Sequence, residues 1–244
     1  MQVISFFSAK GGTGKSTFNM LLASYLKYVL GKRVMVLDLD APGYNLSSTR
    51  EREADGMLQE NPSFDANSLY PIRKIEDLTR SHIKVEIADL KNLEEDYDYV
   101  VIDCPGSLVQ TDASFQMLAA GVFTLIVIPM DIDGMSIASS YSLGEVCKSL
   151  EQPFLLFFNK VYWQEKKDLY AQYEAFFAEG GMRVSPHRVK NSVKLRRDAD
   201  GNAAYMRSSV CFPMKEIKAT VPEILELFEE VLSNVGKEKT EETA

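Results

Sequence analysis

The stretch VISFFSAKGGTGKST (3–17) decides the fold class of this chain. Its apolar first half has the length of a buried strand, its middle is rich in glycine, and a helical pattern follows over 15–30. Glycines between a strand and a helix let backbone N–H groups surround a phosphate, with the helix N-terminus behind them. The sequence therefore predicts a phosphate-binding loop at the start of an α/β domain.

Further apolar runs of strand length alternate with helical patterns along the chain. The runs are RVMVLDLD (33–40), DYVVIDCP (98–105), VFTLIVIP (122–129) and PFLLFFNK (153–160). Such runs are typical of strands buried on both faces, and their alternation with helices predicts a doubly wound, mostly parallel sheet flanked by helices. Residues 71–95 fit either a strand plus a helix or mostly helix. The carboxyl ends of the strands are expected to share one site.

Composition predicts one domain and an intracellular setting. The chain has 244 residues, a net charge of −8 and no linker-like segment, so we expect a single domain over 1–235 and a disordered tail over 236–244. No apolar run reaches the roughly 18–20 residues of a membrane span, and the helical pattern near the C-terminus carries a glutamate-rich face that anionic lipid would repel. Three scattered cysteines fit reduced thiols. We therefore expect a bacterial cytoplasmic protein, nucleoid-associated if it binds DNA, with no membrane partner.

The loop residues predict how a nucleotide would be held. Lys15 is expected to reach the β- and γ-phosphates of ATP or ADP, the Ser16 hydroxyl to bind Mg²⁺, and Thr17 to lie near the α-phosphate. The remaining backbone contacts are expected from Gly11, Gly12, Thr13 and Gly14.

The segment KGGTGKST (10–17) resembles the deviant Walker A motif of the ParA/MinD family of P-loop ATPases. Ala9 stands where the ordinary motif has its first glycine. Lys10 stands at the position of the signature lysine of the family. The resemblance implies that Lys10 reaches across a dimer interface to the nucleotide of a second copy, so that ATP joins two subunits. A second cation at the developing negative charge suits phosphoryl transfer.

Two more segments resemble the family in order and spacing. VMVLDLDAPGYN (34–45) is similar to its D-x-D-P-x-G-N segment, which implies that Asp40 positions or activates the attacking water, with Asp38 beside it. YDYVVIDCPGS (97–107) is similar to its Walker B strand, which places Asp103 next to Mg²⁺. Ser16, Asp40 and Asp103 are thus the expected metal ligands. The chain departs from the family pattern at Ala41, Tyr44 and Gly106.

The base site is carried by two looser matches. Asn159 stands where the family has an adenine-reading asparagine, and Pro213 resembles the late loop that packs on the base. Each residue also fits an ordinary structural role, Asn159 as a satisfied turn asparagine.

The stretch RVSPHRVKNSVKLRR (183–197) is basic and holds no acidic residue, although the chain as a whole is acidic. The resemblance implies non-specific DNA binding by the ATP dimer through such a surface, and the alternative is a solvated basic loop. The cations are Arg183, Arg188, Lys190, Lys194, Arg196 and Arg197.

The resemblance implies an ATPase of low intrinsic turnover that segregates or positions plasmid or mobile-element DNA. A ParB-like partner protein would stimulate hydrolysis. One alternative is an ATP-gated positioning module for a protein cargo, such as a conjugation apparatus, that contacts an adaptor and no DNA. Another is a nucleotide-dependent interaction module with negligible turnover.

Overall fold

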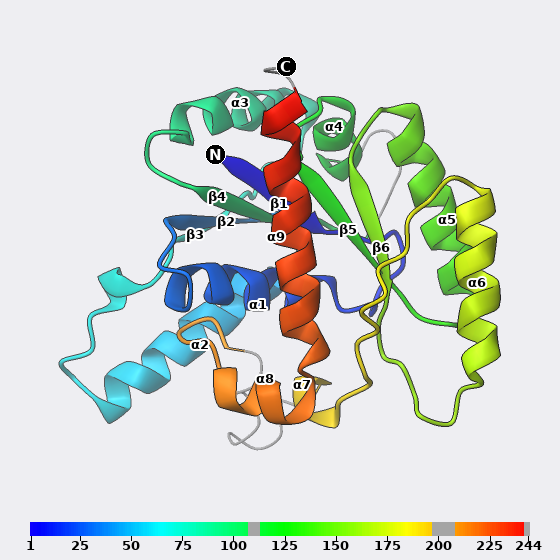
Figure 1. Cartoon of the computed structure of the whole chain (residues 1–244). Coiled ribbons are helices and arrows are strands. Elements are labelled where there is room, and N and C mark those ends of the chain that lie inside the picture. Colours follow the sequence, from blue (N-terminus) through cyan, green and yellow to red (C-terminus); the bar gives the residue numbers. More distant parts are fainter. Residues whose placement is uncertain (107–112, 197–207, 242–244) are drawn as a thin grey trace.

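The computed structural model describes residues 1–106, 113–196 and 208–241, and its centre is a six-stranded sheet (Figure 1). The strand order is β3-β2-β4-β1-β5-β6, and every neighbouring pair is parallel. The strands are β1 (Gln2–Phe6), β2 (Val34–Asp38), β3 (Ile72–Lys74), β4 (Tyr99–Asp103), β5 (Leu125–Met130) and β6 (Phe154–Phe158). The predicted doubly wound parallel sheet is confirmed.

Helices cover both faces of this sheet because strand side chains alternate between two cores. Along β1, for example, Ile4 and Phe6 belong to one buried cluster, and Val3 with the following Phe7 to the other. The first cluster includes α1 (Lys15–Tyr28), α2 (Asn45–Glu60), α8 (Met214–Thr220) and α9 (Glu223–Glu241). The second includes α3 (Arg80–Leu90), α4 (Ala113–Ala119), α5 (Gly134–Ser149) and α6 (Lys167–Glu179). Short helical turns complete the elements as η1 (Ala66–Ser68), η2 (Lys91–Leu93) and α7 (Val193–Arg196).

The structure resolves two points that the sequence left open or placed differently. The ambiguous segment 71–95 forms a strand and a helix, β3 and α3, joined by a short loop. Helix α9 continues through Glu241, into the segment 236–244 that the sequence predicted to be disordered. Within the described part of the chain, no helix is both long and apolar enough to cross a membrane.

The sheet order determines where the site forms. Strand β1 lies between β4 and β5, and the chain leaves β1 to build one half of the sheet before it returns for the other. Ligands of open parallel sheets bind beyond the carboxyl ends of the strands, where such a reversal opens a crevice. The glycine-rich loop after β1 lies at this edge.

An aromatic cluster fixes α1 and α9 to the centre of the sheet. The ring of Phe6 lies 5.1 Å from that of Phe18 and 6.1 Å from that of Phe228, and Phe157 contacts Phe18 at 5.0 Å. All four side chains are buried. Helix α9 runs across the same face as α1 in Figure 1, so its anchoring closes this core.

Removing the α9 ring should therefore destabilise the whole fold. Phe228→Ala is expected to lower the free energy of unfolding by about 3–5 kcal/mol, because it deletes a fully buried ring and leaves a cavity. Urea unfolding followed by circular dichroism measures this loss. The neighbouring exposed Glu229 supplies the control, since Glu229→Ala should change stability by less than about 0.5 kcal/mol. Equal effects of the two substitutions would contradict the packing described.

Candidate functional site

The loop after β1 has the backbone shape of a phosphate cradle. Gly12 and Gly14 adopt left-handed conformations, with φ of 76° and 103°, and Gly14 is the N-cap of α1. A Cβ on Gly14 would lie 2.7 Å from Nδ2 of Asn159, so glycine is required here both for its conformation and for space. The loop thereby brings backbone N–H groups and the start of α1 to one point.

Two residues at the end of β6 hold the outer side of this loop. Nδ2 of Asn159 donates a hydrogen bond of 2.7 Å to the carbonyl oxygen of Thr13, and Nζ of Lys160 donates one to that of Gly12. The Asn159 side chain is buried and lines the cavity, but its amide group contacts the loop in this structure. A role for Asn159 in reading adenine would therefore use the amide oxygen or the second N–H of the amide group.

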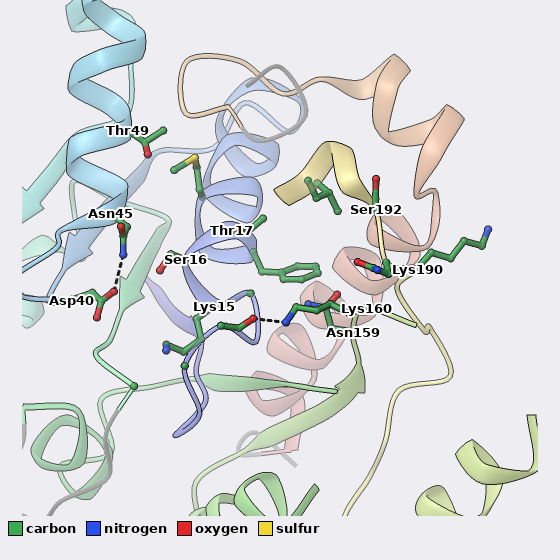
Figure 2. A pocket seen from close by; sticks show the side chains of 18 residues that line it. Lys15, Ser16, Thr17, Asp40, Asn45, Thr49, Asn159, Lys160, Lys190 and Ser192 are labelled. Atoms are coloured by element: carbon green, nitrogen blue, oxygen red, sulfur yellow. Dashed lines mark hydrogen bonds between the residues drawn. The ribbon is translucent and has the colours of Figure 1, made fainter. Parts of the chain in front are cut away.

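The loop opens into a cavity of about 620 Å³ (Figure 2). Its walls come from the loop, the start of α1, the loop before α2 and the segment after β6. Of the residues predicted for the site, the cavity is lined by Gly11, Gly12, Gly14, Lys15, Ser16, Thr17, Asp40 and Asn159. Thr13, in the same loop, is buried, and its carbonyl oxygen accepts the hydrogen bond from Asn159.

Gly106, a departure from the family pattern, lies against Lys15. A Cβ on Gly106 would be 2.8 Å from Nζ of Lys15, which is itself buried. Glycine therefore leaves room for the Lys15 ammonium group, in the position from which it would reach phosphates.

Asp103 is a fully buried carboxyl group at the end of β4. Its Oδ1 accepts a hydrogen bond of 2.8 Å from Nδ2 of Asn19, and its side chain is fully buried. Burial raises the pKa of Asp103 to about 7, although the Ser16 hydroxyl and the Asn19 amide favour the charged form. Its Oδ2 is buried without a hydrogen-bond partner in the described part of the chain.

This orphan oxygen fits a cation that shares the site with a nucleotide. The described residues contain no cluster of three side chains able to hold a metal ion by themselves. Mg²⁺ needs none, because it takes one or two protein oxygens and completes its shell with phosphates and water. Ser16 and Asp103 supply oxygens of this kind, and Asp40 lines the cavity.

The two aspartates at the end of β2, Asp38 within the strand and Asp40 beyond it, have different surroundings. Oδ2 of Asp38 accepts hydrogen bonds from the backbone N–H and the hydroxyl of Ser47, at 2.9 and 2.8 Å, so this buried side chain holds the start of α2. Asp40 is only partly buried, and its Oδ2 accepts a bond of 3.2 Å from Asn45. Asp40 is thus the one positioned to face a ligand (Figure 2).

Lys10 lies outside this cavity. Its Nζ contacts both oxygens of Asp133, at 2.7 and 2.8 Å, and the Lys10 ammonium lowers the pKa of Asp133. Asp133 is the N-cap of α5, where its Oδ1 also accepts a bond of 3.0 Å from the backbone N–H of Ser136. In this structure Lys10 is therefore bound to its own chain.

The structure does not bring Pro213 into the cavity. Pro213 is the N-cap of α8, whereas the cavity wall beside Asn159 comes from another segment. That segment pairs with the chain after β6 through a bridge between Val161 and Lys190. Sequence reasoning missed its lining residues, which are Lys190, Asn191, Ser192 and Leu195.

Acidic side chains of the same chain meet part of the basic stretch. Lys190 pairs with Glu223 and Arg188 with Glu174, each at 2.7 Å. Arg183 pairs with Glu230 of α9. The side chains of Lys194 and Arg196, and all of Arg197, lie outside the described part of the structure.

The fold and the site together define a P-loop ATPase of the ParA/MinD type. The family described as ATPase MipZ matches residues 2–135, more than half of the chain, and the chain belongs to this family.

Curated relatives match different shares of the chain. An uncharacterized ATP-binding protein of Methanocaldococcus jannaschii, MJ0924, is 36% identical over 119 residues, which cover 44% of this chain and 45% of the relative. The sporulation initiation inhibitor Soj of Bacillus subtilis is 27% identical over 131 residues, covering 44% and 51%. The chain thus matches about half the length of these two proteins. The virulence plasmid ParA family protein pGP5-D of Chlamydia psittaci is 24% identical over 255 residues, covering 95% and 94%.

Solved structures show the same fold. Apo McdA of Cyanothece superposes with a TM-score of 0.68 at 20% identity, covering 97% of this chain and all of that one. A putative plasmid partition protein of Borrelia burgdorferi bound to AMPPNP superposes with a TM-score of 0.63 at 21% identity, covering 94% and 98%.

The buried Asp103 carboxylate should lower the free energy of unfolding as long as no cation is bound next to it. Asp103→Asn is expected to raise the free energy of unfolding of the nucleotide-free protein by about 1–3 kcal/mol at pH 8, because it removes a buried, incompletely paired charge. The same substitution should abolish the extra stability that ATP with Mg²⁺ gives.

Thermal unfolding with and without ATP and Mg²⁺ measures both effects. The exposed Asp96 provides the control, since Asp96→Asn should change neither. A nucleotide-free Asp103→Asn protein that is less stable than the unsubstituted chain would contradict this account.

Proposed function

We propose that this chain is an ATP-dependent switch that binds and slowly hydrolyses ATP, dimerises in the ATP state, and positions or segregates a cargo. The observation that carries the proposal is the convergence of the cradle, Lys15, Ser16 and Asp40 on one cavity beyond the strand ends. Membership of an ATPase family supports the activity.

Each side chain has a defined part in this proposal. Lys15 binds the β- and γ-phosphates, and backbone N–H groups of the loop surround them. Mg²⁺, when bound, would be held by Ser16 and Asp103 and would neutralise phosphate charge. Asp40 lines the same cavity, where it orients the attacking water. The Asp40 side chain is only partly buried, and among the described residues its carboxylate accepts one hydrogen bond, of 3.2 Å, from Asn45. This loose arrangement fits slow turnover before a partner orders the loop.

Dimerisation requires Lys10 to change partners. The Lys10 ammonium must leave Asp133 before it can reach the nucleotide of a second copy. The two side chains are 30% and 47% exposed, so the pair is weak enough for phosphates to compete with it. The free energy of the ion pair between Lys10 and Asp133 is therefore lost on dimerisation, and a stronger pair would make the dimer weaker.

Two substitutions should therefore move the dimer in opposite directions. Lys10→Ala should abolish dimerisation with a non-hydrolysable ATP analogue and leave ADP binding intact. Asp133→Asn keeps an oxygen for the backbone N–H of Ser136 but removes the charge that holds Lys10. It should lower the dimer dissociation constant about two- to fivefold.

Sedimentation velocity with the analogue and with ADP measures these shifts. The matched control is Asp77→Asn, which should leave the dimer dissociation constant unchanged. Asp77 also accepts a hydrogen bond from a backbone N–H just before a helix, that of Thr79, but it does not contact Lys10 in the structure. Normal dimerisation of Lys10→Ala would sink the proposed role of Lys10, and weaker dimerisation of Asp133→Asn would sink the competition.

Plasmid or mobile-element DNA is the cargo that the relatives favour. The Borrelia protein solved with AMPPNP is described as a plasmid partition protein, and pGP5-D is named as a plasmid ParA family protein. We propose that a ParB-like or cargo adaptor protein stimulates hydrolysis. The pairing of Arg183, Arg188 and Lys190 with glutamates leaves any DNA contact chiefly to the positions 194–197.

DNA binding should appear only in the ATP state if this cargo is right. At fixed moderate salt, the protein is expected to bind DNA with a non-hydrolysable ATP analogue but not with ADP or without nucleotide. Arg196→Glu with Arg197→Glu should weaken this binding at least about tenfold, because counterion release is lost and repulsion is added.

A control with the same change of charge is Lys84→Glu with Lys91→Glu, at two exposed positions near α3. It should leave DNA affinity nearly unchanged. No DNA binding in any nucleotide state would reject DNA as the cargo and favour the positioning of a protein cargo through an adaptor.

A further inference from the structure

Lys160 has a backbone conformation that disfavours its own side chain. Its φ is 54°, in the left-handed region, and among the described non-glycine residues only Tyr44 and Glu151 share a positive φ. A residue with a Cβ is strained there, and such strain persists where the surrounding structure imposes it. Lys160 is the second residue after β6 and lines the cavity, so the reason for its conformation is to be sought in the site.

The left-handed turn directs the Lys160 side chain onto the phosphate loop. Nζ of Lys160 donates a hydrogen bond to the carbonyl oxygen of Gly12 (Figure 2). It also lies 3.1 Å from Oδ2 of Asp131, which follows β5. The preceding Asn159 donates to the carbonyl oxygen of Thr13. Two consecutive residues thus hold two consecutive carbonyl groups of the loop.

Those carbonyl groups determine where the loop donors point. In a planar trans peptide the C=O of one residue and the N–H of the next point in opposite directions. The bond from Lys160 to Gly12 therefore fixes the direction of the Thr13 N–H, and the bond from Asn159 to Thr13 fixes that of the Gly14 N–H. Both carbonyl groups point to residues that follow β6, so the N–H groups point away from those residues and remain available to a phosphate.

Packing does not replace this contact at Gly12. Gly12 is exposed, and a Cβ placed on it would meet no atom within 4 Å. Gly12 and Lys160 also line a second cavity of about 560 Å³. Because Gly12 borders two cavities rather than packed side chains, the peptide after Gly12 depends on its hydrogen bond for its orientation.

We propose that Lys160 is a positioning residue of the phosphate site, which orients the Gly12–Thr13 peptide before a nucleotide arrives. Asp131 holds the Lys160 ammonium in place by charge. The inference rests on the proposed function, because it assumes that the loop receives the phosphates of ATP or ADP. It adds that part of the nucleotide affinity comes from a side chain that need not touch the nucleotide.

Lys160→Gly separates this role from a purely structural one. Glycine suits the left-handed backbone and relieves its strain, so the unfolding temperature should stay the same or rise. The dissociation constants of ADP and of a non-hydrolysable ATP analogue should each rise about tenfold or more, because a charge-assisted hydrogen bond is lost. Lys160→Arg keeps a cationic donor and should restore affinity to within about threefold.

Glu151 provides the matched control. Its φ is 53°, and it lies in the turn between α5 and β6 rather than in the site, so Glu151→Gly should stabilise the chain without changing nucleotide affinity. Isothermal titration calorimetry and thermal unfolding on all four proteins give the two measurements.

Weaker binding by Lys160→Gly at unchanged or higher stability, with recovery in Lys160→Arg, is the expected result. Unchanged affinity in Lys160→Gly would overturn the inference, and so would a loss that follows a fall in stability and is not recovered by arginine. If the unsubstituted chain bound neither ADP nor the analogue, the proposed function itself would fail and this inference with it.

Discussion

The buried amide of Asn19 joins the three elements on which the site depends. Its Oδ1 accepts a bond of 2.8 Å from the backbone N–H of Phe6, and its Nδ2 donates to the carbonyl oxygen of Phe6 and to Asp103. One side chain of α1 thus satisfies the end of β1 and a carboxylate at the end of β4. Because each buried polar group left unpaired costs about 1–3 kcal/mol, these three elements have one relative placement in which all are satisfied. The start of α1, and the loop before it, are located by this constraint.

The same edge of the sheet holds two unfavourable features. Oδ2 of Asp103 is buried without a hydrogen-bond partner among the described residues, and Lys160 has a strained, left-handed backbone. Asn19 and the aromatic cluster below it supply the rigidity that makes both tolerable. A cation and a phosphate would compensate the first and make use of the second, so the arrangement favours the liganded state.

Sequence reasoning was most successful where the signal is local and repeated. The apolar runs predicted five of the strands, because a strand buried on both faces must be apolar throughout. The remaining strand, β3, has only three residues and lies at the sheet edge, too short to show a period, which explains the ambiguity over 71–95. The loop residues 11–17 could be placed because their chemistry and their order coincide in one segment.

Features that depend on long-range pairing were less visible. Asn19 lies within a helical segment whose neighbours are mostly apolar, and this polar exception was the one signal that could have identified it. Lys190 and Leu195 line the cavity only because their segment pairs with the chain after β6, a contact across about thirty residues that no local pattern encodes. Lys160 was overlooked because a left-handed φ at lysine has no signature in the sequence.

The charges near the C-terminus form one system. The glutamates of α9 argued against a lipid anchor, and in the structure Glu223 and Glu230 meet Lys190 and Arg183 of the basic stretch. A cation already paired with a carboxylate gains less from a DNA phosphate, because the carboxylate must be displaced or left unpaired. Lys190 is also part of the wall of the nucleotide cavity. Lys190 therefore belongs at once to the wall of the cavity and to an ion pair with Glu223 of α9, so the cavity and the basic stretch share one side chain.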